Sequence, residues 1–346
     1  MTTSCNQTAI NQMLRGILIL FFGAILIGEI MANEPPIVIA HRGASGYLPE
    51  HTLAAKAMAH AMHADFLEQD VVLTRDHVPV VLHDIHVDTV TDVAKRFPNR
   101  ARADGRYYAI DFDLAELKTL NVSERFDHKT SQPVFPKRFP GHMTLGLTIP
   151  TLAEEIQFIQ GLNKSTGRQA GIYPEVKQPA WHRQQGGDVS REVLKVLGQY
   201  GYDDQTSNVY FQCFEASELK RVRHELGCKL QLIQLLGKGR SGTTDYDAMM
   251  TNEGLAAIAK YADGIGPSVE SLYEANSSGQ ATATDLVQQA HDHGLKVHPY
   301  TLRIDSVPAA FQDVEALTAF LLKSRVDGAF TDFPDVTRSL FKNRDL

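Results

Sequence analysis

Short apolar runs alternate with longer amphipathic stretches over the second half of the chain. The runs are rich in β-branched and aromatic residues, which is typical of buried strands. The stretches between them contain helix formers and few Gly or Pro residues, and therefore predict helices. The predicted strands cover 170–173, 208–213, 229–234, 263–266, 296–300 and 328–331, and the predicted helices cover 152–160, 189–200, 216–226, 254–261, 284–293 and 314–323.

The N-terminal part of the pattern adds two more strands. Residues 37–40 form a β-branched run, 52–63 predict a helix, and 66–74 form a second strand. Residues 79–83 are interpreted as the hairpin partner of that second strand and are counted separately. Alternating strands and helices imply a parallel sheet. Eight such units imply an α/β protein with a closed (β/α)8 TIM barrel.

Residues 85–150 break this alternation. They are rich in Asp, Arg, Gly and Pro and contain one convincing helix, over 114–120. A stretch of about 65 residues is too long for an ordinary loop. We interpret it as an insertion that follows the second strand and its hairpin and stands over the site. Its candidate substrate-facing residues, which could equally pack within the insertion, are Arg96, Arg106, Tyr107 and Tyr108.

Polar residues collect where the predicted strands end. A TIM barrel carries its chemistry at the carboxyl ends of its strands, so this end is the predicted active site. The aromatic residues Trp181, Phe214 and Tyr300 are candidate pocket walls, although apolar packing is the simpler interpretation of each. The polar residues concerned are His41, Glu68, Asp70, Glu175, Lys177, His298, Tyr300 and Asp332.

The turn after the second strand decides which side chains face each other. If Asp76 and His77 form a two-residue loop, Asp70 faces His83 across the hairpin, with Cβ atoms roughly 5 Å apart. Glu68 shares a strand face with Asp70 because the two are two residues apart. Two neighbouring carboxylates repel each other unless a cation joins them. Oxygen ligands favour Ca²⁺ or Mg²⁺, so the pattern predicts a divalent metal site.

Residues 1–32 are predicted to be a signal peptide, which leaves 33–346 as the catalytic domain. The run 16–28 is apolar and follows Arg15. It is shorter than the ~20 residues that a spanning helix needs, and it fits the apolar part of a secretory signal. Cleavage after Ala32 would leave no stable membrane insertion. An uncleaved anchor is the alternative.

Charge and cysteines narrow the class of protein further. The formal net charge is −7 and no Lys/Arg cluster is present, which argues against a nucleic-acid partner. After the leader the only cysteines are Cys213 and Cys228. They are expected at opposite ends of neighbouring strands, so we predict that both pack as small apolar residues without a disulfide.

Several motifs occur in order along the chain: HRGASGYLPEHT, LEQD, VVLHD, YPEVKQP, YFQCF, YADGIGP, VHPYTLR and FTDFPD. Together they resemble the glycerophosphodiester phosphodiesterase family, and in particular its periplasmic bacterial members. The resemblance covers nearly everything after the leader. It implies a TIM barrel with an insertion at the same point, and a periplasmic enzyme.

The resemblance also implies roles for the predicted site residues. It places metal ligands at Glu68, Asp70 and Glu175, and catalytic histidines at His41 and His83. An exported enzyme meets Ca²⁺ more readily than a cytosolic one, so we expect Ca²⁺, with Mg²⁺ as the alternative. Histidine titrates near neutral pH and suits acid–base catalysis; we assign His41 as the acid and His83 as the base.

Two basic residues complete the predicted site. Arg42 and Lys177 are expected to bind the substrate phosphate. The alternative for Arg42 is an ion pair with Glu50 or Asp84. Glu50 itself either adds a metal ligand or orients Arg42.

The activity implied is metal-dependent hydrolysis of glycerophosphodiesters, such as glycerophosphocholine and glycerophosphoethanolamine, to sn-glycerol 3-phosphate and an alcohol. The partner is therefore a small-molecule diester. Three alternatives remain at this point: a phospholipase, a surface binding protein without activity, and a metal-dependent hydrolase of another substrate. The oligomeric state does not follow from the sequence, which is compatible with a homodimer.

Overall fold

The computed structural model describes residues 35–140, 145–238, 244–276 and 279–342. Chain contacts divide the protein into a unit of residues 1–35 and a unit of residues 36–346, and all the described helices and strands belong to the second. The predicted signal peptide, residues 1–32, lies outside the described residues. Among the described helices, none combines the length and apolar character that crossing a membrane requires.

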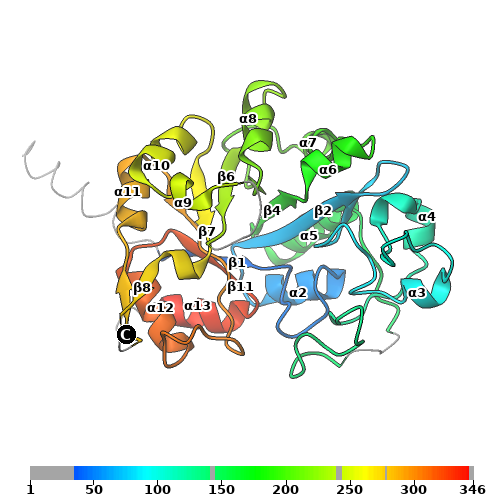
Figure 1. Cartoon of the computed structure of the whole chain (residues 1–346), viewed down its shortest axis with the longest axis horizontal. Coiled ribbons are helices and arrows are strands. Elements are labelled where there is room, and N and C mark those ends of the chain that lie inside the picture. Colours follow the sequence, from blue (N-terminus) through cyan, green and yellow to red (C-terminus); the bar gives the residue numbers. More distant parts are fainter. Residues whose placement is uncertain (1–34, 141–144, 239–243, 277–278, 343–346) are drawn as a thin grey trace, which may run out of the picture. The chain divides into compact units, whose positions relative to one another are not determined.

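Eight parallel strands form a barrel at the centre of the fold (Figure 1). Neighbouring strands pair in the order β10-β7-β6-β5-β4-β2-β1-β11. The gap between the first and last of these is bridged by backbone hydrogen bonds, including Asp327 N–H to Val297 O at 3.0 Å and Phe330 N–H to Pro299 O at 2.9 Å. The predicted barrel is confirmed. Its strands are β1 (Ile37–Ala40), β2 (Phe66–Leu73), β4 (Gly171–Val176), β5 (Tyr210–Cys213), β6 (Gln231–Leu236), β7 (Gly264–Pro267), β10 (Lys296–Val297) and β11 (Gly328–Thr331).

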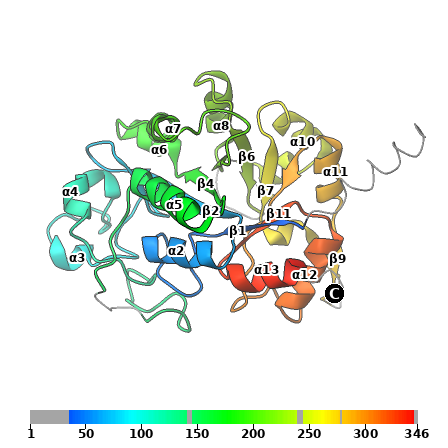
Figure 2. The same cartoon turned by 180° about the vertical axis from the view of Figure 1, so that it is seen from behind.

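Helices follow the strands and cover the outside of the barrel, as Figure 2 shows from behind. Thr151 begins α5 with a capping box: its side chain accepts from Glu154 N–H, and the Glu154 carboxylate accepts from Thr151 N–H. The same helix ends at Gly167, which adopts a left-handed conformation. The main helices are α2 (Leu53–Ala61), α5 (Leu152–Thr166), α7 (Val189–Gln199), α8 (Ala216–His224), α10 (Asn252–Ile258), α11 (Leu286–Asp292), α12 (Val314–Lys323) and α13 (Pro334–Lys342).

Some elements were not expected from the pattern. They are short or lie in segments for which the pattern predicted neither a helix nor a strand. Helix α13 follows the last strand directly and starts at a proline, which suits a first helical turn. The unexpected elements are α6 (Pro179–Gln184), α9 (Tyr246–Met249), η2 (Val269–Ser271), α13, and the hairpin of β8 (Tyr273–Ala275) and β9 (Ala281–Ala283).

The barrel interior is closed below the site by aromatic and aliphatic side chains. Tyr173 and Tyr210 stack with ring centroids 4.9 Å apart. His298, which we counted among the polar residues of the site end, is buried in this layer, and its Nδ1 lies 2.8 Å from the Tyr173 hydroxyl. His298 is therefore part of the barrel packing beneath the site.

The hairpin of β2 and β3 (Pro79–Val81) has a different register from the one we predicted. Val71 pairs with Val81, and Leu82 N–H donates to Asp70 O at 2.8 Å, so Asp70 lies opposite Leu82 and not opposite His83. The loop has three residues, 75–77, because His77 adopts φ 59° and closes the turn in the left-handed region. The predicted two-residue loop is wrong by one position.

The insertion forms a packed layer of its own against this hairpin. It contains α3 (Val93–Arg96), η1 (Ala109–Asp111) and α4 (Leu114–Leu117). Phe112 and Leu117 are fully buried and belong to one cluster with Val72 and Val80 of the hairpin. The hairpin that carries the site residues is therefore packed on the barrel side and on the insertion side.

Cys213 and Cys228 are both buried and free of a disulfide. Both belong to the main hydrophobic cluster of the barrel. The prediction that they pack as apolar residues is confirmed.

A substitution of Gly171, at the start of β4, would test how tightly the barrel interior is packed. A Cβ added there would overlap the Phe66 ring and lie 2.8 Å from the carbonyl oxygen of Asn208. We expect Gly171→Ala to lower the free energy of unfolding by roughly 1–3 kcal/mol, measured by urea denaturation. Gly161→Ala is the control, since Gly161 lies in α5 with open space around its Cβ position. A helical Gly to Ala change should stabilise by about 0.5–1 kcal/mol. Equal effects of the two changes would contradict this packing.

Candidate active site

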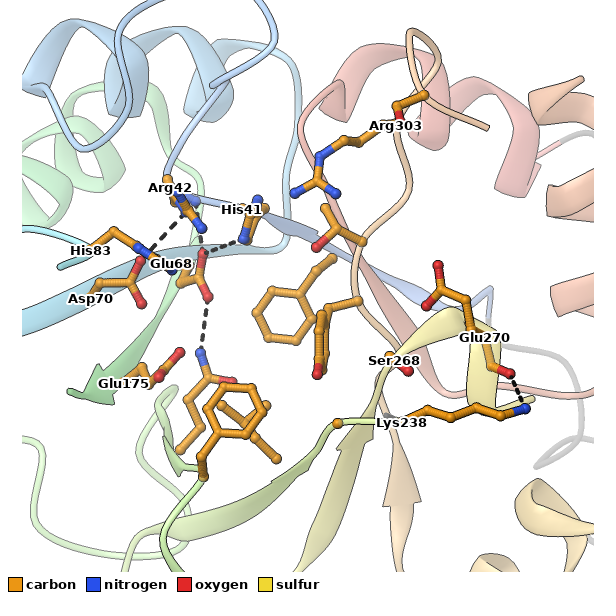
Figure 3. A pocket seen from close by; sticks show the side chains of 18 of the residues that line it. His41, Arg42, Glu68, Asp70, His83, Glu175, Lys238, Ser268, Glu270 and Arg303 are labelled. Atoms are coloured by element: carbon orange, nitrogen blue, oxygen red, sulfur yellow. Dashed lines mark hydrogen bonds and ion pairs between the residues drawn. The ribbon is translucent and has the colours of Figure 1, made fainter. Parts of the chain in front are cut away.

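Three carboxylates meet at the carboxyl ends of two neighbouring strands. Glu68 and Asp70 come from β2, and Glu175 comes from β4, where the parallel register places it level with Asp70. One oxygen atom of each lies within 4.8 Å of the others, and all three residues are buried (Figure 3). The predicted cluster is thus present, and it is built by strand pairing.

Burial of three acids together disturbs their protonation. Burial, then the neighbouring Asp70 and Glu175, raise the pKa of Glu68 well above its usual value. Burial raises the pKa of Glu175 to about 7. Burial acts in the same direction on Asp70, but Lys177 and nearby histidines outweigh it and hold the pKa of Asp70 well below its usual value. A divalent cation bound by the three oxygens would remove this conflict, and an all-oxygen donor set suits Ca²⁺ or Mg²⁺.

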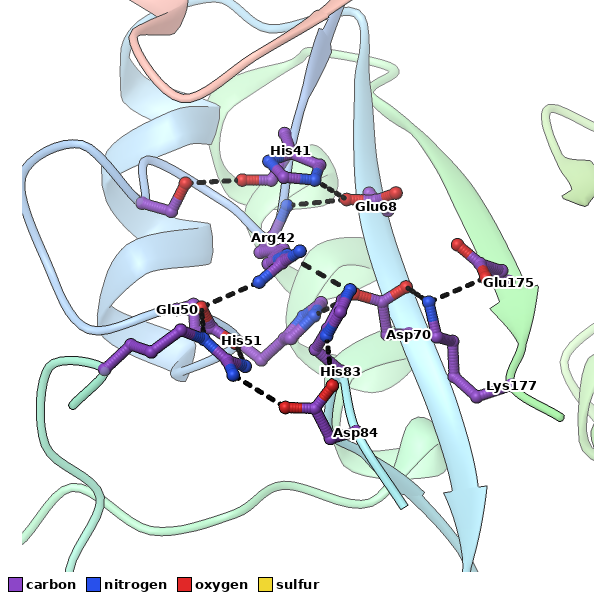
Figure 4. A network of polar contacts seen from close by, with 12 residues as sticks. His41, Arg42, Glu50, His51, Glu68, Asp70, His83, Asp84, Glu175 and Lys177 are labelled. Carbon is purple, nitrogen blue, oxygen red and sulfur yellow. Dashed lines mark hydrogen bonds and ion pairs between the residues drawn. The ribbon is translucent and has the colours of Figure 1, made fainter. Parts of the chain in front are cut away.

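Two cationic side chains flank the carboxylates (Figure 4). Lys177 Nζ lies 2.7 Å from Glu175 Oε1 and 3.5 Å from Asp70 Oδ1. Arg42 NH1 donates to Glu50 Oε2 at 2.9 Å, while its buried Nε–H has no hydrogen-bond acceptor among the described residues. The ion pair of Arg42 with Glu50 that we considered is therefore present, and Arg42 Nε lies 3.6 Å from Asp70 Oδ2.

His41 and His83 each bind an aspartate through Nδ1. His41 Nδ1 lies 2.6 Å from Asp332 Oδ1, and His83 Nδ1 lies 2.7 Å from Asp84 Oδ1. Burial and the charge of Arg42 lower the pKa of His41 to about 4. Burial, Arg42 and Lys177 lower the pKa of His83 to about 3. Both rings are thus neutral with the proton on Nδ1, so Nε2 carries the free lone pair.

His83 reaches this site although the register prediction that placed it there was wrong. The β2–β3 ladder ends at Val81, and the backbone bends at residues 83–85. Leu82 therefore packs into the insertion cluster, and His83 lines the cavity together with Asp70.

These side chains line one end of a cavity of about 530 Å³. Lys238, Ser268 and Glu270 lie at the other end (Figure 3), and Phe214 and Tyr300 also line the cavity. Phe214 and Tyr300 thus contribute to the pocket walls, as we considered. The volume falls in the range of small-molecule sites.

Comparison with known proteins assigns the family. The sequence model of the glycerophosphoryl diester phosphodiesterase family matches residues 41–336. The chain belongs to this family. A glycerophosphodiester phosphodiesterase of Haemophilus influenzae is 47% identical, with 86% of this chain and 88% of that protein covered. One of Treponema pallidum is 37% identical, with coverages of 91% and 93%. The expectation of a phosphodiesterase of this family is confirmed.

Solved structures of the glycerophosphoryl diester phosphodiesterase family share the fold. A protein of this kind from Silicibacter pomeroyi has a TM-score of 0.70 at 24% identity, covering 91% of this chain and 96% of its own. A phosphodiesterase from Oleispira antarctica, in complex with the product sn-glycerol-3-phosphate, has a TM-score of 0.60 at 23% identity, with coverages of 89% and 97%. At these identities the likeness supports the barrel alone.

A buried pair of residues behind the carboxylates was not anticipated from the sequence. His51 Nε2 lies 2.7 Å from Asp70 Oδ2, and its Nδ1 lies 3.4 Å from Lys56 Nζ. Lys56 in turn pairs with Glu155 at 3.1 Å and contacts the carbonyl oxygen of Glu68. His51 stands inside the first motif that we quoted for this family, but Lys56 looks like an ordinary helix residue in the sequence.

The insertion contributes different residues from those we considered. Arg106 pairs with Asp88, and Arg96 pairs with Asp92. Tyr107 is buried in the insertion cluster, and Tyr108 stacks on Trp181. These residues pack within the insertion or against α6, which is the second of the two alternatives that we left open. The insertion residues that reach the aspartates bound to His41 and His83 are Arg125 and Arg138.

Lys56 and Glu155 are fully buried and should matter for stability. Removing one partner of a buried ion pair costs about 3–5 kcal/mol when the other charge remains. We therefore expect Lys56→Met to lower the free energy of unfolding by that order at pH 8, measured by urea denaturation. Lys195→Met, which breaks an exposed pair with Glu192, is the control and should change it by less than about 0.5 kcal/mol.

The loss of stability caused by Lys56→Met should depend on pH. Burial raises the pKa of Glu155 to about 7 even with Lys56 present. The folded protein then keeps this proton over a range in which the unfolded chain has lost it, so stability falls as pH rises from about 4.5 to about 7 and beyond. The variant should lose less stability at pH 5 than at pH 8. A pH-independent loss would contradict a charged Glu155 as its cause.

Proposed function

We propose that this enzyme hydrolyses glycerophosphodiesters in a reaction that depends on a divalent metal ion. The proposed substrates are glycerophosphocholine and glycerophosphoethanolamine, and the products are sn-glycerol 3-phosphate and the free alcohol. The observation that carries the proposal is the meeting of three buried carboxylates, two aspartate-bound histidines and two cations around one cavity. The product bound in the Oleispira antarctica enzyme supports the choice of sn-glycerol 3-phosphate.

The proposed metal ligands are Glu68, Asp70 and Glu175, and Ca²⁺ is the proposed ion. When bound there, the metal would supply positive charge to a phosphate oxygen. Arg42 and Lys177 both lie beside Asp70 and line the cavity. Their cationic side chains would hold the remaining phosphate oxygens. These groups favour an anionic diester and stabilise the extra charge that develops when its phosphorus is attacked.

The two histidines supply the proton transfers in this proposal. His83 Nε2 takes the proton from the attacking oxygen, which we assign to the glycerol 2-hydroxyl. His41, protonated on Nε2 once the anionic substrate is bound, gives its proton to the oxygen of the departing alcohol. A cyclic phosphate results, and water opens it to sn-glycerol 3-phosphate with the two histidine roles reversed.

We propose that residues 1–32 act as a signal peptide and that the mature enzyme is periplasmic. The apolar run after Arg15 supports export, and so does the resemblance to periplasmic family members. Mass spectrometry of the protein recovered from the periplasm would test this, with a start at Asn33 as the expected result. A protein that retains Met1 or Met13 and stays with the membrane would favour the uncleaved anchor.

Metal dependence can be tested with the purified enzyme. After treatment with EDTA we expect no turnover of glycerophosphocholine, measured as sn-glycerol 3-phosphate formed, and recovery on addition of Ca²⁺. Glu175→Gln should not recover, whereas Glu192→Gln, a carboxylate on the surface of α7, should recover fully. Full activity of the EDTA-treated protein without added metal would refute the role of the carboxylates.

The proposed histidine roles predict a large loss of turnover in variants that remain folded. His41→Ala and His83→Ala should each reduce kcat by roughly 10²–10⁴-fold while the circular dichroism spectrum stays unchanged. His224→Ala, at the exposed end of α8, is the control and should keep wild-type turnover. A folded His83→Ala variant with wild-type kcat would remove His83 from the mechanism.

A further inference from the structure

Each catalytic histidine is supported by an aspartate, and each aspartate is held by an arginine of the insertion. Asp332 accepts from His41 through Oδ1, and its Oδ2 accepts from Arg138 NH2 at 2.7 Å. Asp84 accepts from His83 through Oδ1, and its Oδ2 accepts from Arg125 NH1 at 2.6 Å. In both arrangements Oδ1 faces the histidine and Oδ2 accepts from an arginine of the insertion, although Asp332 follows β11 and Asp84 follows β3.

Arg138 is fixed from several sides. Its guanidinium also forms a two-pronged pair with Asp305, at 2.8 and 3.1 Å, and lies 3.7 Å from the centre of the Phe135 ring. Its side chain is 4% exposed. Arg303 donates to the same Asp332 oxygen at 2.7 Å. Charge-assisted bonds in a buried setting have well-defined geometry, so the Asp332 carboxylate is held in one orientation.

Arg125 performs the equivalent task for His83. Besides Asp84 it binds Glu50 through two contacts, at 2.6 and 3.1 Å. Glu50 in turn accepts from Arg42. Arg125 is therefore connected to one histidine and, through Glu50, to the arginine that faces the substrate phosphate.

An aspartate that accepts from Nδ1 sets the ring orientation and leaves Nε2 as the reactive nitrogen. A carboxylate that is bound only by the imidazole could rotate about its own bond. The second oxygen of each aspartate is held by an arginine here, which removes this freedom.

We propose that the insertion is part of the catalytic apparatus, with Arg138 and Arg125 as positioning residues that act through Asp332 and Asp84 to fix the Nδ1–H tautomer of His41 and His83. The inference rests on the proposed acid and base roles of the two histidines. It makes the insertion a requirement for turnover and gives it a task other than covering the cavity.

Arg138→Met and Arg125→Met test this, with Arg106→Met as the matched control. Arg106 lies in the same insertion and makes an equivalent two-pronged pair with Asp88, at 2.7 and 2.8 Å, but that pair touches neither histidine nor its aspartate. Loss of such a supporting residue typically costs 10–100-fold. We expect a loss of that order in kcat for both test variants, with KM for Arg138→Met within about twofold, and no more than about a twofold change for the control.

A change of leaving group distinguishes a positioning role of the two arginines from a general loss of activity. Compared with glycerophosphocholine, the p-nitrophenyl diester of glycerol 3-phosphate releases an alcohol that needs little protonation. Arg138→Met, which disturbs the acid, should recover most of its activity on this diester, whereas Arg125→Met should lose activity on both substrates. Recovery of Arg125→Met and not of Arg138→Met on this diester would support positioning, but with His83 as the acid and His41 as the base. Equal losses of both variants on both substrates would overturn the inference, as would variants that match the control.

A spectroscopic measurement does not depend on turnover. Long-range ¹H–¹⁵N spectra of the histidine side chains report which ring nitrogen carries the proton. We expect Nδ1–H for His41 and His83 in the wild type and in Arg106→Met, with His41 alone changed in Arg138→Met. Unchanged His41 signals in a folded Arg138→Met variant would overturn the inference. If the wild type hydrolysed neither diester, the proposed function would fail, and this spectrum would still decide whether the arginines position the rings.

Discussion

Three buried acidic side chains, each with an oxygen atom within 4.8 Å of the others, are the constraint on which the rest of the site depends. The pairing of β2 with β4 fixes their positions, because Asp70 and Glu175 stand level in the ladder. Like charges so close cannot all stay ionised without compensation. The surrounding side chains supply this compensation. Lys177 and Arg42 lie on the cavity side of the carboxylates, and His51 binds Asp70 on the opposite side.

The positive charges of the site are divided between the barrel and the insertion. Those from the barrel lie next to the carboxylates and face the cavity. Those from the insertion, Arg125 and Arg138, lie behind the histidines and bind the aspartates that support them. A substrate phosphate would thus contact the first group, while the second group keeps the rings in place. If the proposed positioning role is correct, this division explains how an insertion with little regular structure contributes to turnover.

The sequence predicts those parts of the site that depend on local spacing. Glu68 and Asp70 share a strand face, and His41 ends a strand, so their meeting at one end of a barrel could be anticipated. The position of His83 could not be derived correctly, because one residue, His77, takes a left-handed conformation and changes the loop length. Its place in the cavity was foreseen only through the family motif.

Residues that support the site indirectly show no recognisable spacing in the sequence. Lys56 has the spacing of a helix residue, and its burial against Glu155 appears only when α2 packs on α5. Arg125 and Arg138 lie in a segment without periodicity, and their partners are up to 194 positions away. Contacts of this kind depend on the assembled fold, so neither propensity nor spacing could have predicted them.

The central claim is that the three carboxylates form one metal site. Titration calorimetry of EDTA-treated protein with Ca²⁺ tests it most directly, since it requires neither substrate nor turnover. We expect that one ion binds per chain, and that Glu175→Gln abolishes this binding while the fold is retained. Folded wild-type protein that binds neither Ca²⁺ nor Mg²⁺ would contradict it.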